Sequence, residues 1–452
     1  MKKIFQYIML AVVTIVMASC TSDIEETTAT TGKSNVQLVV GEFPAFGDSQ
    51  TRAIGTPDEG KTSWVEGDEL LLEMTSKTLG TKYAAFKYNG SSWELASGEL
   101  SYKEDEVPTF PHVYYAPNYK WEAGKLVLKE GKVAGTDEYI EGTAQITPNG
   151  EAITVKFSGA TRNYSRLRIA TMPNKPITVD TEYFTPAGSS DMEQKGNYTL
   201  TSDEKGNACL YGTFENNSEV TVKYRGATLK TYKFSKETEN AKSYALDATV
   251  ISANSAEEIK SAIKQEVANS KTAIILNLAS DAGDNEFKTI REAFKNVQDA
   301  TIDLTLIGCK EIPADGLKEL NALKSIFLPD VTKIGMNALS RCVYLEEICA
   351  PNVSTIDERA FAGFIMLEKV TLGELTDVRG EANSGGGIFD DDNWTPYIDL
   401  YLPKNQEVMK GEFDENSNQY IWKPTGESYF ASPDVDNGIF LGYQFNSVKS
   451  WE

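Results

Sequence analysis

The sequence predicts a mixed fold, in which an all-β N-terminal region precedes a short α/β region of stacked repeats. Residues 35–250 contain short stretches of alternating apolar and polar residues, separated by turn residues. Residues 301–376 repeat their apolar positions at a fixed step of 22 residues. The first 20 residues differ from both regions and end in a cysteine. The chain therefore divides into an export segment, a β region and a repeat region.

Residues 1–19 have the composition of a secretory signal peptide. Two lysines, Lys2 and Lys3, precede an apolar run that is too short to span a bilayer and that ends in Ala18 and Ser19. With Cys20, this end resembles a lipobox, which implies that Cys20 is lipidated and anchors the chain to a membrane. A soluble secreted protein with a chance cysteine is the alternative.

Residues 20–34 are rich in Thr, Glu and Ala and show no periodicity, so we expect a flexible tether. Its acidic residues, Asp23, Glu25 and Glu26, resemble the signal that directs lipoproteins of gut and oral Gram-negative anaerobes to the outer leaflet. That resemblance implies an outer-membrane, cell-surface location. On charge alone, an ordinary solvated tether is an equal alternative.

Residues 35–250 are expected to form a β-sandwich region. Leu70, Leu72 and Met74 alternate with polar or outward positions, as in a half-buried strand. Asn89-Gly90 and Asn149-Gly150 are two-residue hairpin signals between such stretches. Over two hundred residues is long for one sandwich, so we expect two subdomains that divide near residue 160.

This region also resembles the fimbrillin-like (Mfa-like) family. The resemblance rests on Pro44-Ala-Phe46, on Thr51-Arg52-Ala53 and on Trp64-Val-Glu-Gly67-Asp68, with Ala241-Lys242-Ser243-Tyr244 near the end. It implies a subunit that can be processed after an arginine, for which Arg52 is the candidate, and assembled into a fimbria by strand exchange.

In the repeat region, the apolar residues fall into columns. The units follow a Leu-x-x-Ile-x-Leu pattern, with other apolar residues at some of its positions, which is the signature of leucine-rich repeats. One unit cannot bury its own apolar face, so units must stack, with their strands in a parallel ladder. The second half of each unit is expected to form a short helix or turn. Two of the columns are Leu304, Ile326, Ile348, Val370 and Leu400, and Leu306, Leu328, Ala350, Leu372 and Leu402.

The runs from Leu323 to Cys342 and from Leu345 to Phe364 resemble the BspA-like leucine-rich repeat, which places Ile-Gly and then Ala-Phe and Cys at these points. Leu339, Asp357 and Phe364 depart from that pattern. The resemblance implies surface adhesion and binding of host proteins. We assign residues 251–452 to this region, with a helical N-terminal cap at 251–300 and a C-terminal cap at 404–452.

Side chains between the inward columns must point outward, onto the concave side if the resemblance holds. Phe327 and Tyr401 are aromatic residues in this otherwise polar stripe, and exposed aromatics often anchor interfaces. The alternative is that they cover neighbouring strands or pack under a cap. The candidate partner-binding residues are Thr305, Phe327, Glu347, Lys369, Thr371 and Tyr401.

The residues that support catalysis or metal binding are few. The single histidine, His112, leaves little for a catalytic triad or a zinc site, so no cofactor and no enzymatic role are expected. The acidic run 390–393 could bind calcium, but a solvated loop is the more common explanation. A net charge of −22 without a basic stripe excludes nucleic acid as an expected partner.

Three functions remain from the sequence. The first is a lipid-anchored adhesin that binds a protein or glycan of the host or of neighbouring bacteria. The second is an accessory or tip subunit of a fimbria. The third, which the sequence favours least, is a glycan-active enzyme that depends on carboxylates alone.

Overall fold

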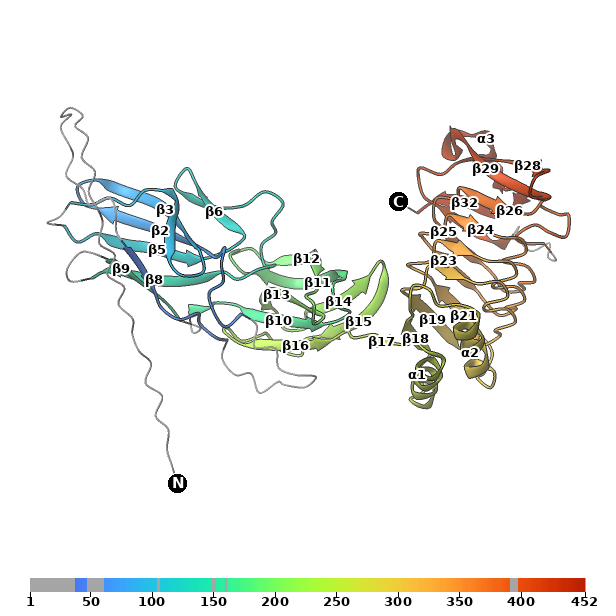
Figure 1. Ribbon diagram of the computed structural model, residues 1–452, viewed down its shortest axis with the longest axis horizontal. Helices are drawn as coiled ribbons and strands as arrows, with labels where there is room; N and C mark the ends of the chain where they lie inside the picture. The colour runs from blue at the N-terminus through green and yellow to red at the C-terminus, as the bar shows by residue number, and fades with distance from the viewer. Residues whose placement is uncertain are drawn as a thin grey trace, which may run out of the picture.

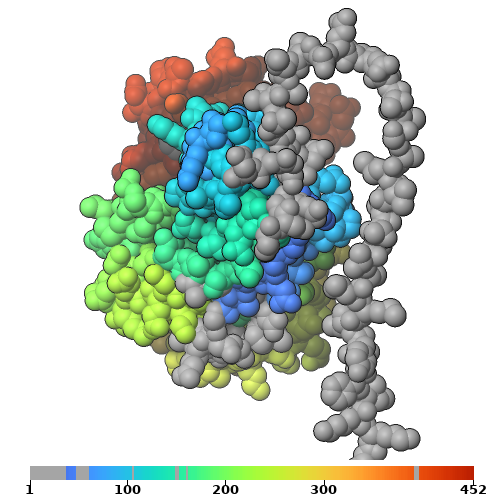
Figure 2. Space-filling model, turned by 90° about the vertical axis from the view of Figure 1, so that its left-hand side faces the viewer, coloured from blue at the N-terminus to red at the C-terminus, as the bar shows by residue number. Residues whose placement is uncertain are grey.

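The computed structural model describes residues 37–46, 61–103, 106–147, 152–158, 161–390 and 397–451. The predicted signal peptide, Cys20, the tether, the 51–53 motif with Arg52, the Asn149-Gly150 turn and residues 391–393 lie outside the described residues. The described part is mostly β. Three sheet regions follow one another in chain order along an elongated molecule (Figure 1). Viewed along the long axis, the first region lies in front of the other two (Figure 2).

The first region is one seven-stranded sheet. Its edge strands β1 and β4 contact each other, so the sheet curls around its own core instead of pairing two separate sheets. Leu70, Leu72 and Met74 are fully buried in this core, as their alternation predicts. The strand order is β1 (Gln37–Val40), β9 (Ala152–Phe157), β8 (Ile140–Ile146), β5 (Thr109–Tyr115), β2 (Glu69–Ser76), β3 (Gly80–Tyr88) and β4 (Trp93–Gly98), with a separate hairpin of β6 (Tyr119–Glu122) and β7 (Lys125–Leu128).

The turn between β3 and β4 is longer than the two residues that its Asn-Gly signal predicts. Tyr88 pairs with Trp93, which leaves a loop of Asn89 to Ser92. The Asn89 side chain accepts hydrogen bonds from the backbone N–H groups of Ser91 and Ser92, at 2.9 and 2.8 Å. The backbone N–H of Asn89 also donates to Ser92 O at 3.0 Å, so a backbone bond and the Asn89 side chain close the turn together.

A second seven-stranded sheet follows, and residue 160, the expected division, lies between β9 and β10. Within this sheet β11 is long enough to pair with β14 at one end and with β13 at the other. The sheet consists of β15 (Ala227–Lys233), β14 (Glu219–Tyr224), β11 (Pro176–Pro186), β13 (Asn207–Phe214), β10 (Ser165–Ala170) and β16 (Ser243–Asp247), with β12 (Glu193–Thr201) paired to β11.

A buried arginine lies between these two sheets. Arg162 is 1 % exposed and donates to the Glu138 carboxylate and to the backbone carbonyls of Pro44 and Ala45. The Phe46 ring stacks on its guanidinium, with 3.9 Å from the ring centroid to Cζ. The Pro44-Ala-Phe46 motif is therefore the segment that holds the junction of the two sheets.

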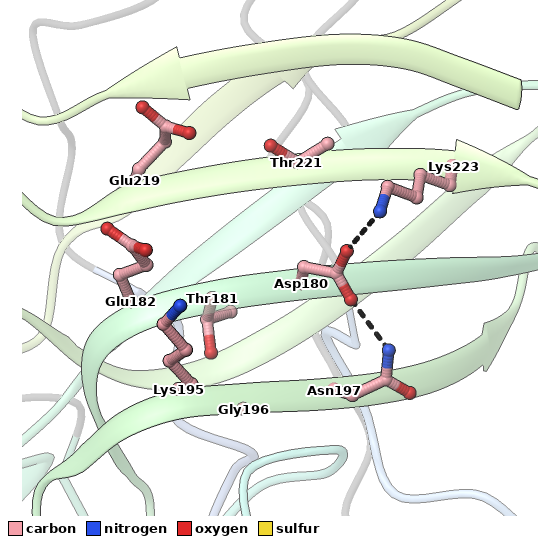
Figure 3. A pocket seen from close by; sticks show the side chains of 9 residues that line it. All are labelled: Asp180, Thr181, Glu182, Lys195, Gly196, Asn197, Glu219, Thr221 and Lys223. Carbon is pink, nitrogen blue, oxygen red and sulfur yellow. Dashed lines mark hydrogen bonds and ion pairs between the residues drawn. The ribbon is translucent and has the colours of Figure 1, made fainter. Parts of the chain in front are cut away.

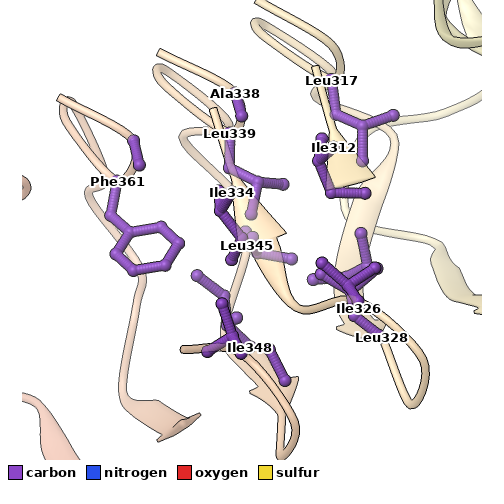
Figure 4. Close-up of a cluster of buried hydrophobic side chains, with 14 of the residues drawn as sticks. Ile312, Leu317, Ile326, Leu328, Ile334, Ala338, Leu339, Leu345, Ile348 and Phe361 are labelled. Atoms are coloured by element: carbon purple, nitrogen blue, oxygen red, sulfur yellow. The ribbon is translucent and has the colours of Figure 1, made fainter. Parts of the chain in front are cut away.

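In the repeat region the strands form a parallel eight-stranded sheet, which we call the ladder. Ile326 pairs with Ile348, and Ile348 pairs with Val370. Residues that are 22 positions apart in the sequence are therefore paired partners on neighbouring strands. The inward columns pack into one continuous core (Figure 4). The ladder runs β17 (Ile251–Ser252), β18 (Ala273–Asn277), β19 (Ile302–Ile307), β21 (Leu323–Phe327), β23 (Glu347–Ala350), β25 (Lys369–Leu372), β27 (Asp399–Leu402) and β32 (Ser447–Ser450).

The second halves of the units are turns and two-residue strands, not the short helices that we considered. Together with three longer strands they form a second sheet, whose order is β20 (Glu311–Ile312), β22 (Lys333–Ile334), β24 (Thr355–Ile356), β26 (Asp377–Arg379), β29 (Gln419–Ser428) and β28 (Glu407–Asp414). The turns hydrogen-bond to the next unit, since Leu317 N donates to Ala338 O and Leu339 N donates to Ala360 O. Within the described residues the fold is therefore predominantly β.

Both ends of the ladder carry additional elements. At the start, α1 (Ala256–Ala268) and α2 (Asp284–Phe294) cover the core with Ile259, Ile263 and Phe287. The Ser255 side chain caps α1 by accepting from Glu258 N. At the other end lie β28, β29, α3 (Pro433–Asp436) and the hairpin of β30 (Ile439–Phe440) and β31 (Tyr443–Gln444).

Candidate binding surface on the ladder

The ladder presents two rows of outward side chains, because residues alternate faces along each strand. The sequence pattern indicates most of both rows, except for Ile275 on β18 and for Ser447 and Lys449 on β32, the strands at the two ends of the alignment. The central row is Ile275, Thr305, Phe327, Cys349, Thr371, Tyr401 and Lys449. The flanking row is Asp303, Ser325, Glu347, Lys369, Asp399 and Ser447.

The second sheet of the β region covers the first part of the central row. Ile275 packs with Tyr224 and Met172 in an apolar cluster. A Cβ atom added at Gly226, in the turn between β14 and β15, would lie 3.4 Å from Cζ of Phe327. The aromatic candidate Phe327 is therefore half-buried against the β region of the same chain, a contact that the sequence did not suggest.

Tyr401 lies further along the central row and, like Phe327, is half-buried. Its ring is flanked by two lysine ammonium groups, with Nζ of Lys369 at 5.5 Å and Nζ of Lys449 at 5.6 Å from the ring centroid. These lysines come from the strands on either side of β27. The three side chains form the centre of what we call the open strip, which comprises Glu347, Cys349, Lys369, Thr371, Asp399, Tyr401 and Lys449.

The charges of the open strip alternate from strand to strand. Lys369 Nζ lies 2.7 Å from Glu347 Oε1, and this hydrogen bond raises the pKa of Lys369. Asp399 accepts from Ser447 and Asn446, both at 2.6 Å, and from Lys449 at 3.2 Å; with the Ser447 hydroxyl contributing most, these bonds lower its carboxyl pKa. The strip is thus a fixed arrangement of paired charges around one aromatic ring.

The remaining candidates of the central row differ in accessibility. Thr371 is buried and Thr305 is half-buried. Burial raises the pKa of the Cys349 thiol to about 11, so this cysteine is protonated at neutral pH. Four of the predicted candidates, Glu347, Lys369, Thr371 and Tyr401, lie in the open strip, and of these Thr371 is buried.

A second polar surface lies on the outer face of β12, β11 and β14, as an open hollow of about 410 Å³ (Figure 3). Asp180 lies at its centre and pairs with Lys223 and Asn197, both at 2.6 Å. Burial raises the Asp180 pKa, but the hydrogen bonds from Lys223 and Asn197 outweigh it and lower the value overall. The hollow is therefore a charged outer face of the sheet, and its central carboxylate is already paired with a lysine.

Two residues considered for chemistry have other roles. His112 lies on β5, where its ring stacks on Tyr114 and its Nδ1 lies 3.0 Å from the Tyr114 hydroxyl. Asp390, from the run considered for calcium, is buried instead of solvated, which corrects that expectation for this residue. Its oxygens accept hydrogen bonds from three backbone N–H groups and from the Tyr443 hydroxyl, so they are occupied without a cation.

The described residues contain neither a candidate metal cluster nor a candidate membrane-spanning helix. No group of three or more His, Cys, Asp or Glu side chains is placed there to hold a metal ion. No helix in that part of the chain is long and apolar enough to cross a membrane.

Comparison with known proteins gives only weak structural similarity. No family model and no curated protein matches the chain. Among solved structures, the chain is similar to a Bacteroides fragilis protein described as a putative cell adhesion protein, with 13 % identity and a TM-score of 0.27. The match covers 48 % of this chain and 92 % of that one.

Proposed function

We propose that the protein is a lipid-anchored surface adhesin whose open strip contacts a protein or glycan partner on the host or on a neighbouring bacterium. In this proposal the repeat region is a leucine-rich-repeat solenoid and Cys20 carries the lipid at the outer membrane. The role is binding, not catalysis.

The observation that carries the proposal is the placement of Tyr401 between Lys369 and Lys449 on a rigid ladder. Aromatic rings with charged neighbours are frequent anchors of interfaces. Because backbone pairing and ion pairs already fix the strip, a partner would order few side chains on binding. Solenoid proteins commonly use such an extended face for binding.

A binding panel tests this proposal directly. Residues 37–452 are immobilised and titrated with purified extracellular-matrix proteins and with glycans from host and bacterial surfaces. We expect saturable binding to at least one of them, lost in the Tyr401→Ser variant. Binding that is unchanged by this variant would place the site elsewhere.

The anchor is tested separately. A Cys20→Ala variant is expected to fractionate with soluble material, whereas the wild-type protein floats with membranes. A variant that still floats would remove Cys20 as the lipid site.

A specific observation supports a fimbrial subunit as the second candidate. β1 is a four-residue strand at the edge of its sheet, paired with β9 alone among the described strands, and Leu38 of β1 and the nearby Phe43 are buried in the core. An edge strand of this kind could be exchanged for a strand of another subunit after cleavage at Arg52. Mass spectrometry that finds residues 21–52 intact on the surface protein would exclude this route.

A further inference from the structure

We propose that the turn between β14 and β15 is an intramolecular cover, which occupies the first part of the ladder face and confines any partner to the open strip. The confinement of a partner rests on the proposed function, whereas the cover itself does not. Figure 1 shows this hairpin reaching the ladder near β18 and β19.

The cover is held by one buried carboxylate. The Asp330 side chain is 4 % exposed and lies just beyond β21. The Tyr224 hydroxyl donates to it at 3.1 Å, and Nη1 of Arg225 lies 3.0 Å away. The backbone N–H of Gly308 donates to its other oxygen at 2.9 Å. Asp330 therefore ties two residues of the hairpin to the ladder, and charge-assisted bonds of this kind are the stronger ones.

The apolar contacts of the cover coincide with the apolar part of the central row. Met172, Tyr224 and Ile307 are buried together, and Ile275 packs against them. The row is apolar at Ile275 and Phe327, where the hairpin lies against it, and becomes polar towards Tyr401 and Lys449. Without the hairpin, both apolar residues would be exposed to solvent. The apolar end of the row is therefore suited to a permanent contact, and the polar end to contact with solvent.

The position of Asp330 recurs in the next repeat unit, where no hairpin residue is bound to it. Asn352 occupies the place of Asp330 one step later, and its Nδ2 donates to Pro329 O at 2.7 Å, within the ladder. The carboxylate at position 330 faces the hairpin, whereas the amide at 352 bonds only to its own region. Asn352 thus offers a matched control.

The rate of trypsin cleavage after Arg225 reports how firmly the hairpin is held on the ladder, because Asp330 pairs with the Arg225 side chain. We expect Asp330→Asn to accelerate cleavage at Arg225–Gly226 at least tenfold, since the amide keeps the shape but loses the charge. Tyr224→Phe should accelerate it less. Asn352→Ala should leave the rate of cleavage after Arg225 unchanged. Cleavage after Lys205, in a separate turn of the same sheet region, should proceed at the same rate in every variant. Circular dichroism verifies that each variant is folded.

Small-angle scattering on the same proteins provides the second readout. Asp330→Asn should broaden the distance distribution, as the two regions move apart about the linker before β17. Equal cleavage rates and equal scattering in wild type and Asp330→Asn would overturn the cover. If cleavage and scattering change but the panel of partners binds nothing, the cover stands and the proposed function fails.

Discussion

Asp390 shows how one buried side chain can organise an irregular loop. Its Oδ1 accepts from Asn383 N and from the Tyr443 hydroxyl, and its Oδ2 accepts from Gly385 N and Gly387 N. Burial alone raises the pKa of this carboxyl, but the four hydrogen bonds outweigh burial and lower it. The loop is therefore built on the charged form of Asp390.

This predicts an acid-sensitive C-terminal cap. A carboxyl with a lowered pKa in the folded state contributes its full stability above the ordinary aspartate value of about 4, and loses it as the pH falls through the folded-state pKa. Asp390→Asn should lower stability at pH 7 by about 1.5–3 kcal/mol, the usual range for bonds to a charged group. Chemical denaturation between pH 7 and 3 should show a shallower pH dependence in the variant. Parallel curves for both proteins would contradict this role.

Arg162 is a buried charged residue in the β region, and its substitution is expected to lower the free energy of unfolding more than that of Asp390. Its guanidinium is buried with Glu138, so Arg162→Met leaves an unpaired buried carboxylate and should destabilise the region by about 3–5 kcal/mol. Adding Glu138→Gln should recover part of this loss. Lys236→Met removes an exposed pair with Glu239 and should change stability by less than about 1 kcal/mol. Equal effects of Arg162→Met and Lys236→Met on urea midpoints would contradict the account.

At the scale of elements, the 22-residue step made the ladder predictable, because a parallel register repeats the sequence period directly. The second halves of the units were harder to predict, because their polar groups bond between units and not within a helix. Two columns in these turns adopt positive φ angles: Asp315, Asn337 and Arg359, at 53–56°, and Glu319, Arg341 and Gly363, at 60–82°. A right-handed helix cannot contain a left-handed residue at two positions four apart. Gly363, Asn337 and Asp315 are residue types that signal this conformation in the sequence, whereas the other three are not.

Close packing between units predicts the effect of one glycine. A Cβ at Gly335 would lie 2.8 Å from Ala314 N and 2.9 Å from Ile312 O, both backbone atoms of the preceding unit. Gly335→Ala should therefore destabilise the repeat region by about 1–3 kcal/mol. Gly386→Ala is the control, since its nearest neighbour would be a side-chain oxygen at 3.7 Å. Thermal melts in which both variants match the wild type would contradict this packing.

At the scale of the whole molecule, the sequence indicated which side chains face outward but not which of them remain accessible. Alternation placed Phe327 and Tyr401 in the same row, and this is how they lie. The contact that separates them joins Tyr224 to Asp330, which are 106 residues apart, and no local pattern encodes such a contact. Tertiary packing thus divides one regular face into a covered part and an open strip.

The comparison of Tyr401→Ser with Phe327→Ser, measured as binding and as melting temperature, tests the central claim most directly. Tyr401→Ser should weaken partner binding at least tenfold and leave the melting temperature nearly unchanged, because it removes an anchor from the open strip. Phe327→Ser should lower the melting temperature and leave binding nearly intact, because its ring packs against Gly226 of the same chain. If Phe327→Ser abolishes binding without a change in stability, while Tyr401→Ser binds like the wild type, the division of the ladder face is contradicted.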